Sequence, residues 1–520
     1  MAVARADPHS PEDSMHRVTP NGQTALLSDN WLLIALALCL TALHILTNGQ
    51  YGFHRDELAA VDDARYLAWG YVAYPPVTPL LARLSLELFG PSLRGARLFP
   101  ALAQAVSVIL TGLMARELGG NRFAQVTAAL AVAIAPVSLA SATLLQYVAF
   151  DYMWWVATAF LVIRLLRSED PRLWLAIGAA IGLGMLTKYS MVFLVAGLVI
   201  GVLATDARKY LKSKWLWAGI GLSLLIFLPN LIWQIRHDFI SLDFLRHIHA
   251  RDVRIGRTDG FWIDQLTITT CPVTVPLWIT GLFSLFVVPE FRRYRPITWM
   301  FIVPFALFVI AKGRGYYMAP AYPMLLAVGA VIEKRWVQGL SPGWSRLVRA
   351  GTLAVLAIGG VVVAAVALPV APVGSAWWEK ANMRDFREEI GWPELVAEVA
   401  RIRDSLPVEE RGRTGILATN YGEAGAINLY GATFGLPGAI SGVNSYWLRG
   451  YGDPPPEALI VLGLSSERAN DLFESCELAG HVTNRYDIRN EETLEHPDIF
   501  VCSRPRNPWP EFWNKFRHFG

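Results

Sequence analysis

Residues 350–370 read AGTLAVLAIGGVVVAAVALPV, a run of 21 residues without a charged side chain. The core of a bilayer is roughly 30 Å thick and is crossed by a helix of about 20 mostly apolar residues, so this run predicts a membrane-spanning helix. Ten further apolar stretches can be assigned in the same way, although several of them are short. The eleven predicted spans are 31–46, 98–118, 123–140, 147–166, 173–186, 191–204, 215–233, 273–288, 297–311, 316–332 and 350–370.

The composition of the whole chain agrees with a polytopic α-helical membrane protein. Charged residues make up 17% of the 520 residues and apolar residues 53%, whereas a soluble protein usually contains about 25% charged residues. This composition excludes a cytosolic enzyme, a disordered chain and a secreted disulfide-rich scaffold. The net charge is only +3 and no tract is basic enough to indicate a nucleic-acid surface, so we expect no nucleic-acid partner.

Basic residues orient the predicted spans, because short cytoplasmic loops are enriched in Lys and Arg. With the amino terminus inside, Lys and Arg gather in the inner loops, and the short outer loops contain only Lys188, Lys312 and Arg314. This pattern holds through all eleven spans. It predicts a multi-pass protein of a bacterial-type plasma (inner) membrane, with a cytoplasmic amino terminus and an extracytoplasmic carboxy-terminal domain.

Three parts of the chain differ in composition. Residues 1–28 are polar and contain three prolines, and we expect them to form a disordered cytoplasmic tail. Residues 29–370 contain the predicted spans, with two long outer loops at 47–97 and 234–271. Residues 371–520 lose the long apolar runs, which predicts a small extracytoplasmic α/β domain.

Within this last part, short apolar runs predict strands and charged periodic stretches predict helices. The expected strands are 415–419, 458–464 and 498–503, and the expected helices are 393–405 and 465–476. An oxidising compartment allows a disulfide between Cys476 and Cys502. Spacing alone does not fix this pairing, so free thiols remain the alternative.

The first long outer loop begins with YGFHRDEL at 51–58, which places Asp56 and Glu57 directly after a predicted span. Ionisable groups close to a membrane must be solvated or paired, so this cluster is either an interfacial patch or a functional site. Three later features favour a functional site: Asp62 with Asp63, a rigid YPP turn at 74–76, and an amphipathic stretch at 77–89 that can lie flat on the membrane.

The second long outer loop is strongly basic, against the trend of the other outer loops. It contains Arg236, His237, Arg246, His247, His249, Arg251, Arg254 and Arg257. The loop either serves an anionic group, such as the phosphate of a lipid carrier, or forms ion pairs with its own aspartates. Two histidines without a third ligand do not support a metal site. We therefore expect that no cofactor is required, with a divalent metal left as an alternative.

Further ionisable residues lie at the predicted outer ends of the spans. Asp151 begins the fourth span, Lys188 lies in the turn between the fifth and sixth spans, and Lys312 follows the ninth. Ionisable residues in or beside apolar spans are candidates for function. All three are predicted on the same membrane face as Asp56, which is the strongest indication of a site in this sequence.

Taken together, these features resemble the GT-C type of membrane glycosyltransferases, specifically the family 39 group. That group includes the protein O-mannosyltransferases and the aminoarabinose transferases that modify lipid A. The resemblance covers roughly residues 31–332. It rests on the acidic pair Asp56-Glu57, the YPP turn with the amphipathic stretch after it, Ser92 with Arg97-Leu98, GLGMLTKY at 182–189, LPN at 228–230 and the YY, Pro320 and YP elements of 316–323.

The resemblance implies a GT-C-like fold and an inverting transfer of a sugar from a polyprenyl-phosphate donor to an acceptor hydroxyl at the outer face of the plasma membrane. Asp56 would be the catalytic base, while Glu57 and Asp151 would orient the acceptor or the sugar. Cationic side chains would hold the departing phosphate, namely Lys188, Lys312 and Arg314 or Arg236. The other expected substrate-binding residues are His54, Arg55, Tyr74, His237 and Tyr316. Asp62 and Asp63 compete with Asp56 for the role of base.

The implied partners are the polyprenyl-phosphate sugar, a lipid, polysaccharide or protein acceptor, and membrane lipids. The main alternative is a polytopic transporter or flippase of a lipid-linked sugar. Transporters tend to contain internal repeats and midplane sites, and neither is evident here. A ligase with a diphosphate donor and a non-catalytic assembly factor are further alternatives. The sequence NYGE at 420–423 either caps a cleft or forms a strand-to-helix turn.

Overall fold

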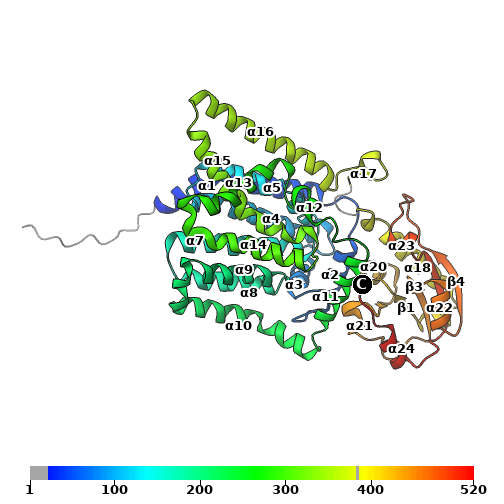
Figure 1. Ribbon diagram of the computed structural model, residues 1–520. Helices are drawn as coiled ribbons and strands as arrows, with labels where there is room; N and C mark the ends of the chain where they lie inside the picture. The colour runs from blue at the N-terminus through cyan, green and yellow to red at the C-terminus, as the bar shows by residue number, and fades with distance from the viewer. Residues whose placement is uncertain (1–20, 382–385) are drawn as a thin grey trace, which may run out of the picture.

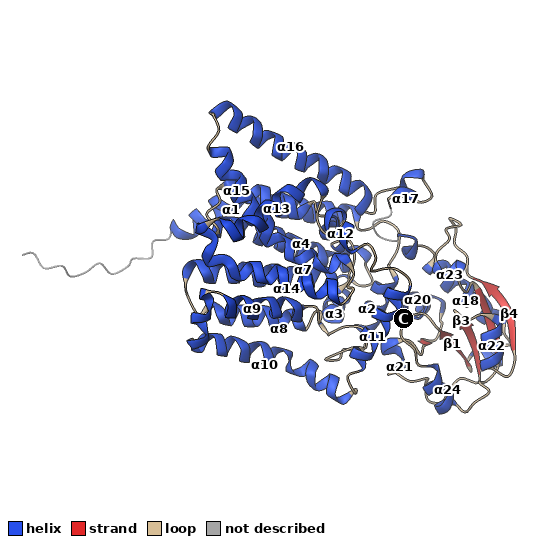
Figure 2. Cartoon of the chain, viewed as in Figure 1, coloured by secondary structure: helices blue, strands red, loops and turns tan. Residues whose placement is uncertain are grey.

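The structure, a computed structural model, describes residues 21–381 and 386–520. A bundle of long helices lies beside a smaller carboxy-terminal domain (Figure 1). Strands occur only in this domain among the described residues, as Figure 2 shows. The helices of the bundle are α1 (Asn21–Thr47), α4 (Leu93–Glu117), α5 (Arg122–Ala133), α6 (Pro136–Ser141), α7 (Tyr147–Ser168), α8 (Leu173–Met185), α9 (Met191–Ala204), α10 (Lys214–Arg236), α13 (Val275–Val287), α14 (Arg295–Ile310), α15 (Tyr322–Gln338) and α16 (Pro342–Ala367).

Four shorter helices cover the end of the bundle that faces the domain (Figure 1), which is called the domain end below. They are α2 (Arg55–Asp63), α3 (Val77–Phe89), α11 (Ile240–Arg254) and α12 (Phe261–Thr267). Short 3₁₀ helices complete the bundle as η1 (Asp206–Lys212), η2 (Pro272–Thr274), η3 (Pro289–Tyr294) and η4 (Gly315–Ala321). The predicted amphipathic stretch at 77–89 is thus the helix α3. Its exposed side includes Leu80, Leu84 and Leu88.

Every predicted apolar stretch contains a helix, but not every helix is long enough to cross a bilayer alone. By length and composition, the described residues contain seven spanning helices, or up to nine if two bent pairs each count as one span. The bends are 98° between α9 and η1 and 85° between α12 and the helical segment from Pro272 to Val287. The shorter α5 and α8 contain 12 and 13 residues. At 1.5 Å per residue they are only about 20 Å long.

Two boundaries differ from the sequence expectation. The third predicted span, 123–140, is broken between α5 and α6, because Pro136 cannot donate the backbone hydrogen bond that would continue the helix. The predicted disordered tail falls largely on residues 1–20, which lie outside the described residues. The remaining part, 21–28, belongs to α1, and the good helix formers in ALL at 25–27 account for this correction.

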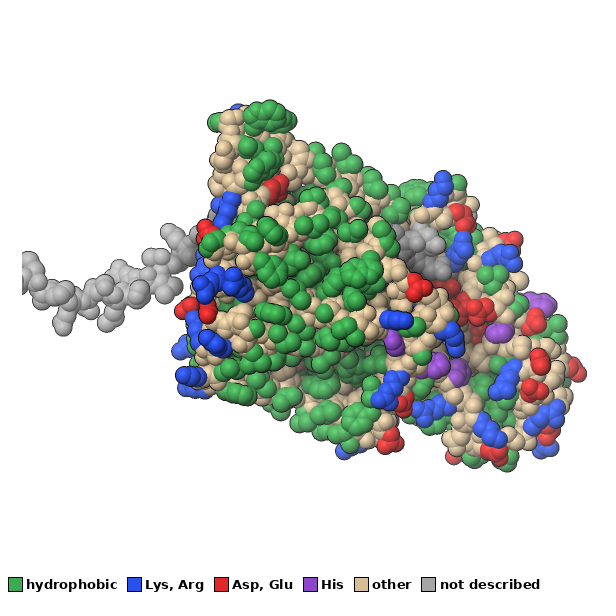
Figure 3. All heavy atoms as spheres, viewed as in Figure 1, with side chains coloured by type: hydrophobic (Ala, Val, Ile, Leu, Met, Phe, Trp, Pro, Cys, Tyr) green, Lys and Arg blue, Asp and Glu red, His purple; other side chains and the backbone are tan. Residues whose placement is uncertain are grey.

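Lys and Arg side chains gather at the end of the bundle that faces away from the domain (Figure 3), while the side of the bundle between the two ends is largely apolar. The loops at that end include the connections between α4 and α5, α7 and α8, and α9 and α10. The loops predicted to be cytoplasmic therefore share one end of the bundle, as the predicted alternation of inner and outer loops requires.

The carboxy-terminal domain is built around one mixed sheet with the strand order β2-β1-β3-β5-β4. β1 is parallel to β2 and β3, whereas β5 is antiparallel to β3 and β4. Its strands are β1 (Thr414–Ala418), β2 (Ala439–Ile440), β3 (Ala458–Leu462), β4 (Cys476–His481) and β5 (Asp498–Cys502). Its helices are α17 (Ala376–Lys380), η5 (Phe386–Glu389), α18 (Trp392–Ser405), α19 (Val408–Arg411), α20 (Tyr421–Tyr430), η6 (Gly431–Phe434), α21 (Asn444–Trp447), α22 (Ser466–Leu472), α23 (Glu491–Leu494) and α24 (Trp509–Phe516).

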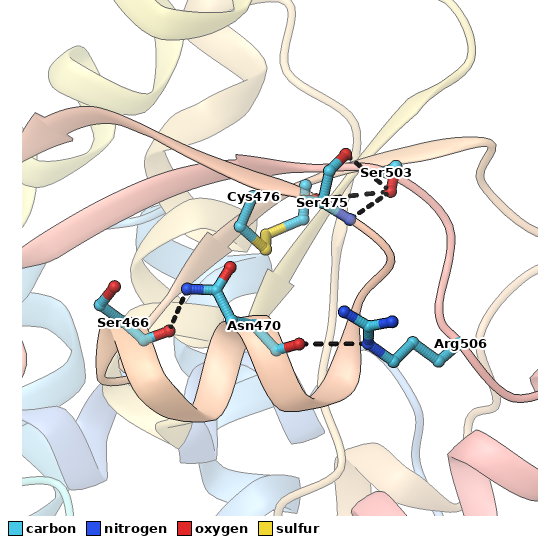
Figure 4. Close-up of a disulfide and its surroundings, with 7 residues drawn as sticks. Ser466, Asn470, Ser475, Cys476, Ser503 and Arg506 are labelled. Carbon is cyan, nitrogen blue, oxygen red and sulfur yellow. Dashed lines mark hydrogen bonds between the residues drawn. A yellow bond between two sulfur atoms is a disulfide. The ribbon is translucent and has the colours of Figure 1, made fainter.

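The three predicted strands are confirmed as β1, β3 and β5, and the helix predicted at 393–405 is confirmed as α18. The helix predicted at 465–476 is too long, because α22 ends at Leu472 and Cys476 begins β4. Cys476 and Cys502 lie opposite each other in the β4–β5 register and form a disulfide (Figure 4). This bond connects the edge strand β4 to its only neighbour in the sheet.

One helix of the first outer loop packs into the core of the domain. Ile416 and Ile460 face one side of the sheet, and Leu58 and Val61 of α2 belong to the same apolar cluster. Neighbouring residues of β1 and β3 point to the opposite side of the sheet, where they pack against α24. Because α2 buries its apolar face against the domain, the domain helps to position the acidic residues of α2.

Candidate active site

The acidic pair lies in the first turn of α2. The backbone N–H of Asp56 donates to Nδ1 of His54 over 3.2 Å, and the backbone N–H of His54 donates to Oε2 of Glu57 over 2.9 Å. These two bonds form a capping box. The partial positive charge of a helix amino terminus stabilises nearby carboxylates. His54, predicted to bind substrate, therefore begins the helix that carries the acidic pair.

Glu57 is enclosed by a buried ion pair with Arg97 of α4. Both side chains have no exposed surface, and Nη2 of Arg97 donates to Oε2 of Glu57 over 2.7 Å. Oε1 accepts from Nε of Arg97 over 2.9 Å and from the backbone N–H of Leu145 over 2.8 Å. Burial favours the neutral acid, but the charge and hydrogen bonds of Arg97 hold the pKa of Glu57 below its usual value. Glu57 thus anchors α2 rather than facing a substrate.

The second acidic pair of α2 is held by the domain. Arg449 donates to a carboxylate oxygen of Asp62 and, through its other terminal nitrogen, to one of Asp63. Tyr74 donates its hydroxyl to Oδ2 of Asp63 over 2.6 Å. Burial raises the pKa of Asp63 to about 6, although the charge of Arg449 opposes this shift. Asp62 and Asp63, which compete with Asp56 for the role of base, are therefore engaged in these contacts. The hydroxyl of Tyr74 is engaged as well.

Asp56 has a different environment from the other three acids of α2. Its side chain is 30% exposed. Nε2 of Gln146 donates to Oδ2 over 2.7 Å, and the hydroxyl of Tyr421 donates to Oδ1 over 3.0 Å. Among the described residues, no Arg or Lys forms an ion pair with Asp56. Asp56 is therefore the carboxylate of α2 that combines fixed orientation with access.

Lys188 and Asp151 lie next to each other, and Lys188 is linked to Asp56 through Tyr147 and Gln146. Nζ of Lys188 is 3.7 Å from Oδ2 of Asp151, which also accepts from the hydroxyl of Ser190 over 2.9 Å. The ammonium lies 4.2 Å from the ring centre of Tyr317 and 5.1 Å from that of Tyr147. Since Tyr147 directly follows Gln146, two adjacent residues at the start of α7 connect the surroundings of Asp56 to those of Lys188.

Arg314 and Tyr316 extend this group of side chains. Nε of Arg314 donates to Oδ2 of Asp252 in α11 over 2.7 Å, and Nη1 donates to the hydroxyl of Tyr316 over 3.4 Å. The rings of Tyr316 and Tyr317 meet edge to face with centres 4.7 Å apart. The contacts of Gln146, Tyr147 and Tyr317 thus link Asp56, Asp151, Lys188, Arg314 and Tyr316 into one group of side chains, and their roles stay predictions.

The other predicted binding residues have different surroundings. Arg55 forms ion pairs with Glu388, Glu491 and Glu492 of the domain. His237 stacks on Trp233, with ring centres 4.0 Å apart. Lys312 and Arg236 are exposed, and neither contacts the group around Lys188. These four residues gain no support from the geometry as substrate ligands.

Several residues of the site have no clear signal in the sequence. Gln146 and Tyr147 lie a few residues before Asp151, which is the residue of this stretch that the sequence predicts as a candidate. Tyr317 is part of the YY element of the resemblance but is not predicted as a binding residue, and Ser190 precedes α9 without any such signal. Tyr421 belongs to NYGE, for which the sequence leaves two interpretations open. The structure shows the strand-to-helix turn, in which Asn420 caps α20 with its side chain, and Tyr421 also donates a hydrogen bond to Asp56.

A separate cavity of about 250 Å³ lies in the domain at the carboxyl ends of β1 and β3. Its lining comprises Thr419, Asn420, Glu423, Gly463, Glu491, Glu492, Glu495, His496 and His518. Glu423 is 1% exposed. Burial raises its pKa to about 8, and the charge of Glu492 adds to the increase. Within residues 21–381 and 386–520, no three His, Cys, Asp or Glu side chains are placed to hold a metal ion.

The titration of Glu423 predicts a pH dependence of stability. Its pKa is raised from an ordinary 4.5 to about 8 in the fold, so the folded chain keeps this proton where the unfolded chain has lost it. This contribution is fully present below about pH 4.5 and decreases as the pH rises, by on the order of a few kcal/mol, until it levels off above about pH 8. Glu423→Gln removes the titration.

We therefore expect the apparent Tm of the wild type to fall relative to that of Glu423→Gln between pH 5 and pH 8, measured on the full chain in detergent. Glu495→Gln, at an exposed position of the same cavity, is the matched control and should follow the wild type. A Tm difference between wild type and Glu423→Gln that does not change with pH would contradict the prediction.

Comparison with known proteins gives a consistent result. The family model described as dolichyl-phosphate-mannose-protein mannosyltransferase matches residues 73–233. The lipid A galacturonosyltransferase RgtD of Rhizobium johnstonii is 27% identical over 54% of this chain and 62% of its own length. The undecaprenyl phosphate-alpha-4-amino-4-deoxy-L-arabinose arabinosyl transferase 1 of Pseudomonas fluorescens is 28% identical over 53% of this chain and 52% of its own. The chain thus spans about half to three-fifths of the length of these curated relatives.

The fold is similar to that of ArnT from Cupriavidus metallidurans. The structure of that protein bound to undecaprenyl phosphate has a TM-score of 0.56 at 16% identity, covering 93% of this chain and 98% of that one. Its apo structure has a TM-score of 0.58 at 16% identity, covering 92% and 98%. The predicted resemblance to GT-C membrane glycosyltransferases is confirmed, and so is the fold class of a polytopic helical protein with a small carboxy-terminal α/β domain.

Proposed function

We propose that this chain is a membrane glycosyltransferase that moves a sugar from a polyprenyl-phosphate donor to an acceptor hydroxyl at the outer face of the plasma membrane. The observation that carries the proposal is that a partly exposed carboxylate, Asp56, is linked through Gln146 and Tyr147 to a cation held between two aromatic rings, Lys188. The names of the similar proteins support the donor class, since they include transferases of undecaprenyl-phosphate-linked sugars. The acceptor is a lipid, a polysaccharide or a protein.

The proposed reaction is a single inverting displacement. Asp56 removes the proton of the acceptor hydroxyl while the acceptor oxygen attacks the anomeric carbon. The bond between that carbon and the phosphate oxygen breaks, and the polyprenyl phosphate leaves with the electron pair. A carboxylate that accepts one hydrogen bond on each oxygen retains lone pairs for this proton. The acceptor ends as a glycoside, and the proton resides on Asp56.

Lys188 suits the stabilisation of the leaving phosphate. A cation that is already in place when charge develops on the phosphate lowers the barrier, since little reorganisation is needed. The rings of Tyr147 and Tyr317 and the carboxylate of Asp151 hold the ammonium in one position. Asp151 therefore acts through Lys188 in this proposal. Arg314 provides a second cation at the same side of the site.

The arrangement favours transfer over transport. The described ionisable cluster is at the domain end of the bundle, with Asp56 on a helix that packs into the domain core. A transporter of a lipid-linked sugar needs a binding site accessible from both membrane faces, usually near the midplane. A site closed by a domain on one face serves a surface reaction instead.

Replacement of the proposed base is the first test. We expect Asp56→Asn to lower the rate of sugar transfer by a factor of about 10² to 10⁴, because the amide cannot accept the proton. The assay uses the purified full chain, undecaprenyl-phosphate sugars and separate arms with lipid, polysaccharide and protein acceptors. It contains EDTA, because we propose that no metal is required. Asp243→Asn, at an exposed position of α11, serves as the control. Full activity of Asp56→Asn would disprove its role as base.

Replacement of the proposed phosphate-binding cation is the second test. Lys188→Gln removes the charge but retains a polar side chain, and we expect kcat/KM for the donor to fall by about 10²-fold. KM for the acceptor should change little, since the lysine is proposed to contact the donor. Lys515→Gln, exposed on α24, provides the comparison. An unchanged kcat with a raised KM for the acceptor would argue against a role of Lys188 at the donor phosphate.

The orientation in the membrane is open to a direct test. A reporter fused after Gly520 is expected to give an extracytoplasmic signal, and one inserted in the loop at 205–213 a cytoplasmic signal. The basic loops at the end of the bundle opposite the domain are the reason for this expectation. A cytoplasmic signal after Gly520 would place Asp56 on the wrong side for the proposed reaction.

A further inference from the structure

One of the two hydrogen bonds to Asp56 comes from the carboxy-terminal domain. Tyr421 is the first residue of α20 and donates its hydroxyl to Oδ1 of Asp56 over 3.0 Å, across 365 residues of sequence. The other bond comes from Gln146 of the bundle and ends on Oδ2. The orientation of this carboxylate is thus set jointly by the bundle and the domain, whose residues share one apolar cluster at this place.

The position of Tyr421 is itself fixed by several contacts. Its ring lies under the guanidinium of Arg55, 5.4 Å from the ring centre, and Arg55 is in turn held by Glu491 and Glu492. Asn420 caps the amino terminus of α20. At Gly425, one turn later, a Cβ atom would lie only 2.8 Å from Leu58. This close approach of α20 to α2 requires glycine and keeps the hydroxyl within reach of Asp56.

The hydroxyl of Tyr421 can act only as a donor toward this acid. Burial and the negative charge of Asp56 both raise the pKa of Tyr421 well above its usual value, so the phenol keeps its proton at neutral pH. A carboxylate held by one donor on each oxygen cannot rotate about its Cβ–Cγ bond without breaking one of them. Such fixation matters because a displacement of about 1 Å can cost on the order of 10² in rate.

We propose that Tyr421 is a positioning residue for the transfer reaction, and that the carboxy-terminal domain completes the active site by orienting Asp56 through it. This inference rests on the proposed function and on Asp56 as its base. Tyr421 contacts neither the sugar nor the phosphate in this account. It acts through the carboxylate, so its removal lowers the rate of the chemical step and leaves substrate binding unchanged.

Tyr421→Phe tests the proposal, because it removes the hydroxyl and retains the ring that packs against Arg55. We expect kcat to fall by about 10- to 100-fold, with KM for donor and acceptor within about twofold of the wild type. Tyr430→Phe is the matched control, since it removes a hydroxyl at the other end of the same helix, and should retain wild-type kcat. An equal kcat for Tyr421→Phe and wild type would overturn the proposal, as would a change confined to KM.

The same assay separates this inference from the proposed function. If wild type is active, Asp56→Asn is inactive and Tyr421→Phe matches wild type, the role of Tyr421 is wrong and that of Asp56 stands. If Asp56→Asn retains activity, the base is wrong and the inference falls with it. A structure of the Tyr421→Phe chain gives a readout without activity. We expect the Asp56 carboxylate to rotate away from its wild-type orientation, and an unchanged orientation would overturn the proposal.

Discussion

Arg97 lies entirely inside the protein, and its guanidinium holds together segments that are far apart in sequence. It donates to the carboxylate of Glu57, to the backbone oxygens of Asn48 and Gly52, and to Glu389 of the carboxy-terminal domain. Burying charges is costly, so the removal of either partner of such a pair typically costs about 3 to 5 kcal/mol. The bundle, the first outer loop and the domain therefore share one electrostatic centre. The position of α2, and with it the site, depends on this centre.

The acids of α2 show how a protein can separate structural charges from a reactive one. Glu57 is neutralised by Arg97, and Asp62 and Asp63 are both held by Arg449. Asp56 instead receives neutral donors, an amide and a phenol. A neutral donor orients a carboxylate without the strong electrostatic stabilisation that an arginine provides. Asp56 is thus oriented by neutral donors, while the ion pairs of its neighbours provide rigidity.

The sequence predicts those helices and strands whose burial requires a run of apolar residues within one continuous segment. Apolar runs reveal the helices of the bundle, and short apolar runs reveal β1, β3 and β5. The sequence does not predict β4, because none of its six residues is buried and three of them are exposed. The choice between Asp56, Asp62 and Asp63 also required the structure, since Arg449 lies more than 380 residues away. Spacing cannot reveal such partners, nor can it distinguish caged Lys188 from exposed Lys312.

The distribution of these contacts along the chain has a consequence for biogenesis. Chains are made from the amino terminus, and domains generally fold as units in that order. Arg449 forms ion pairs with Asp62 and Asp63 of α2. It is synthesised after all the helices of the bundle. Until then, Tyr74 and Arg65 can contact these carboxylates, but the arginine that holds both of them is absent. The helix that carries Asp56 therefore reaches its final environment last, so a chain interrupted before Arg449 would insert its helices yet leave its first outer loop unfinished.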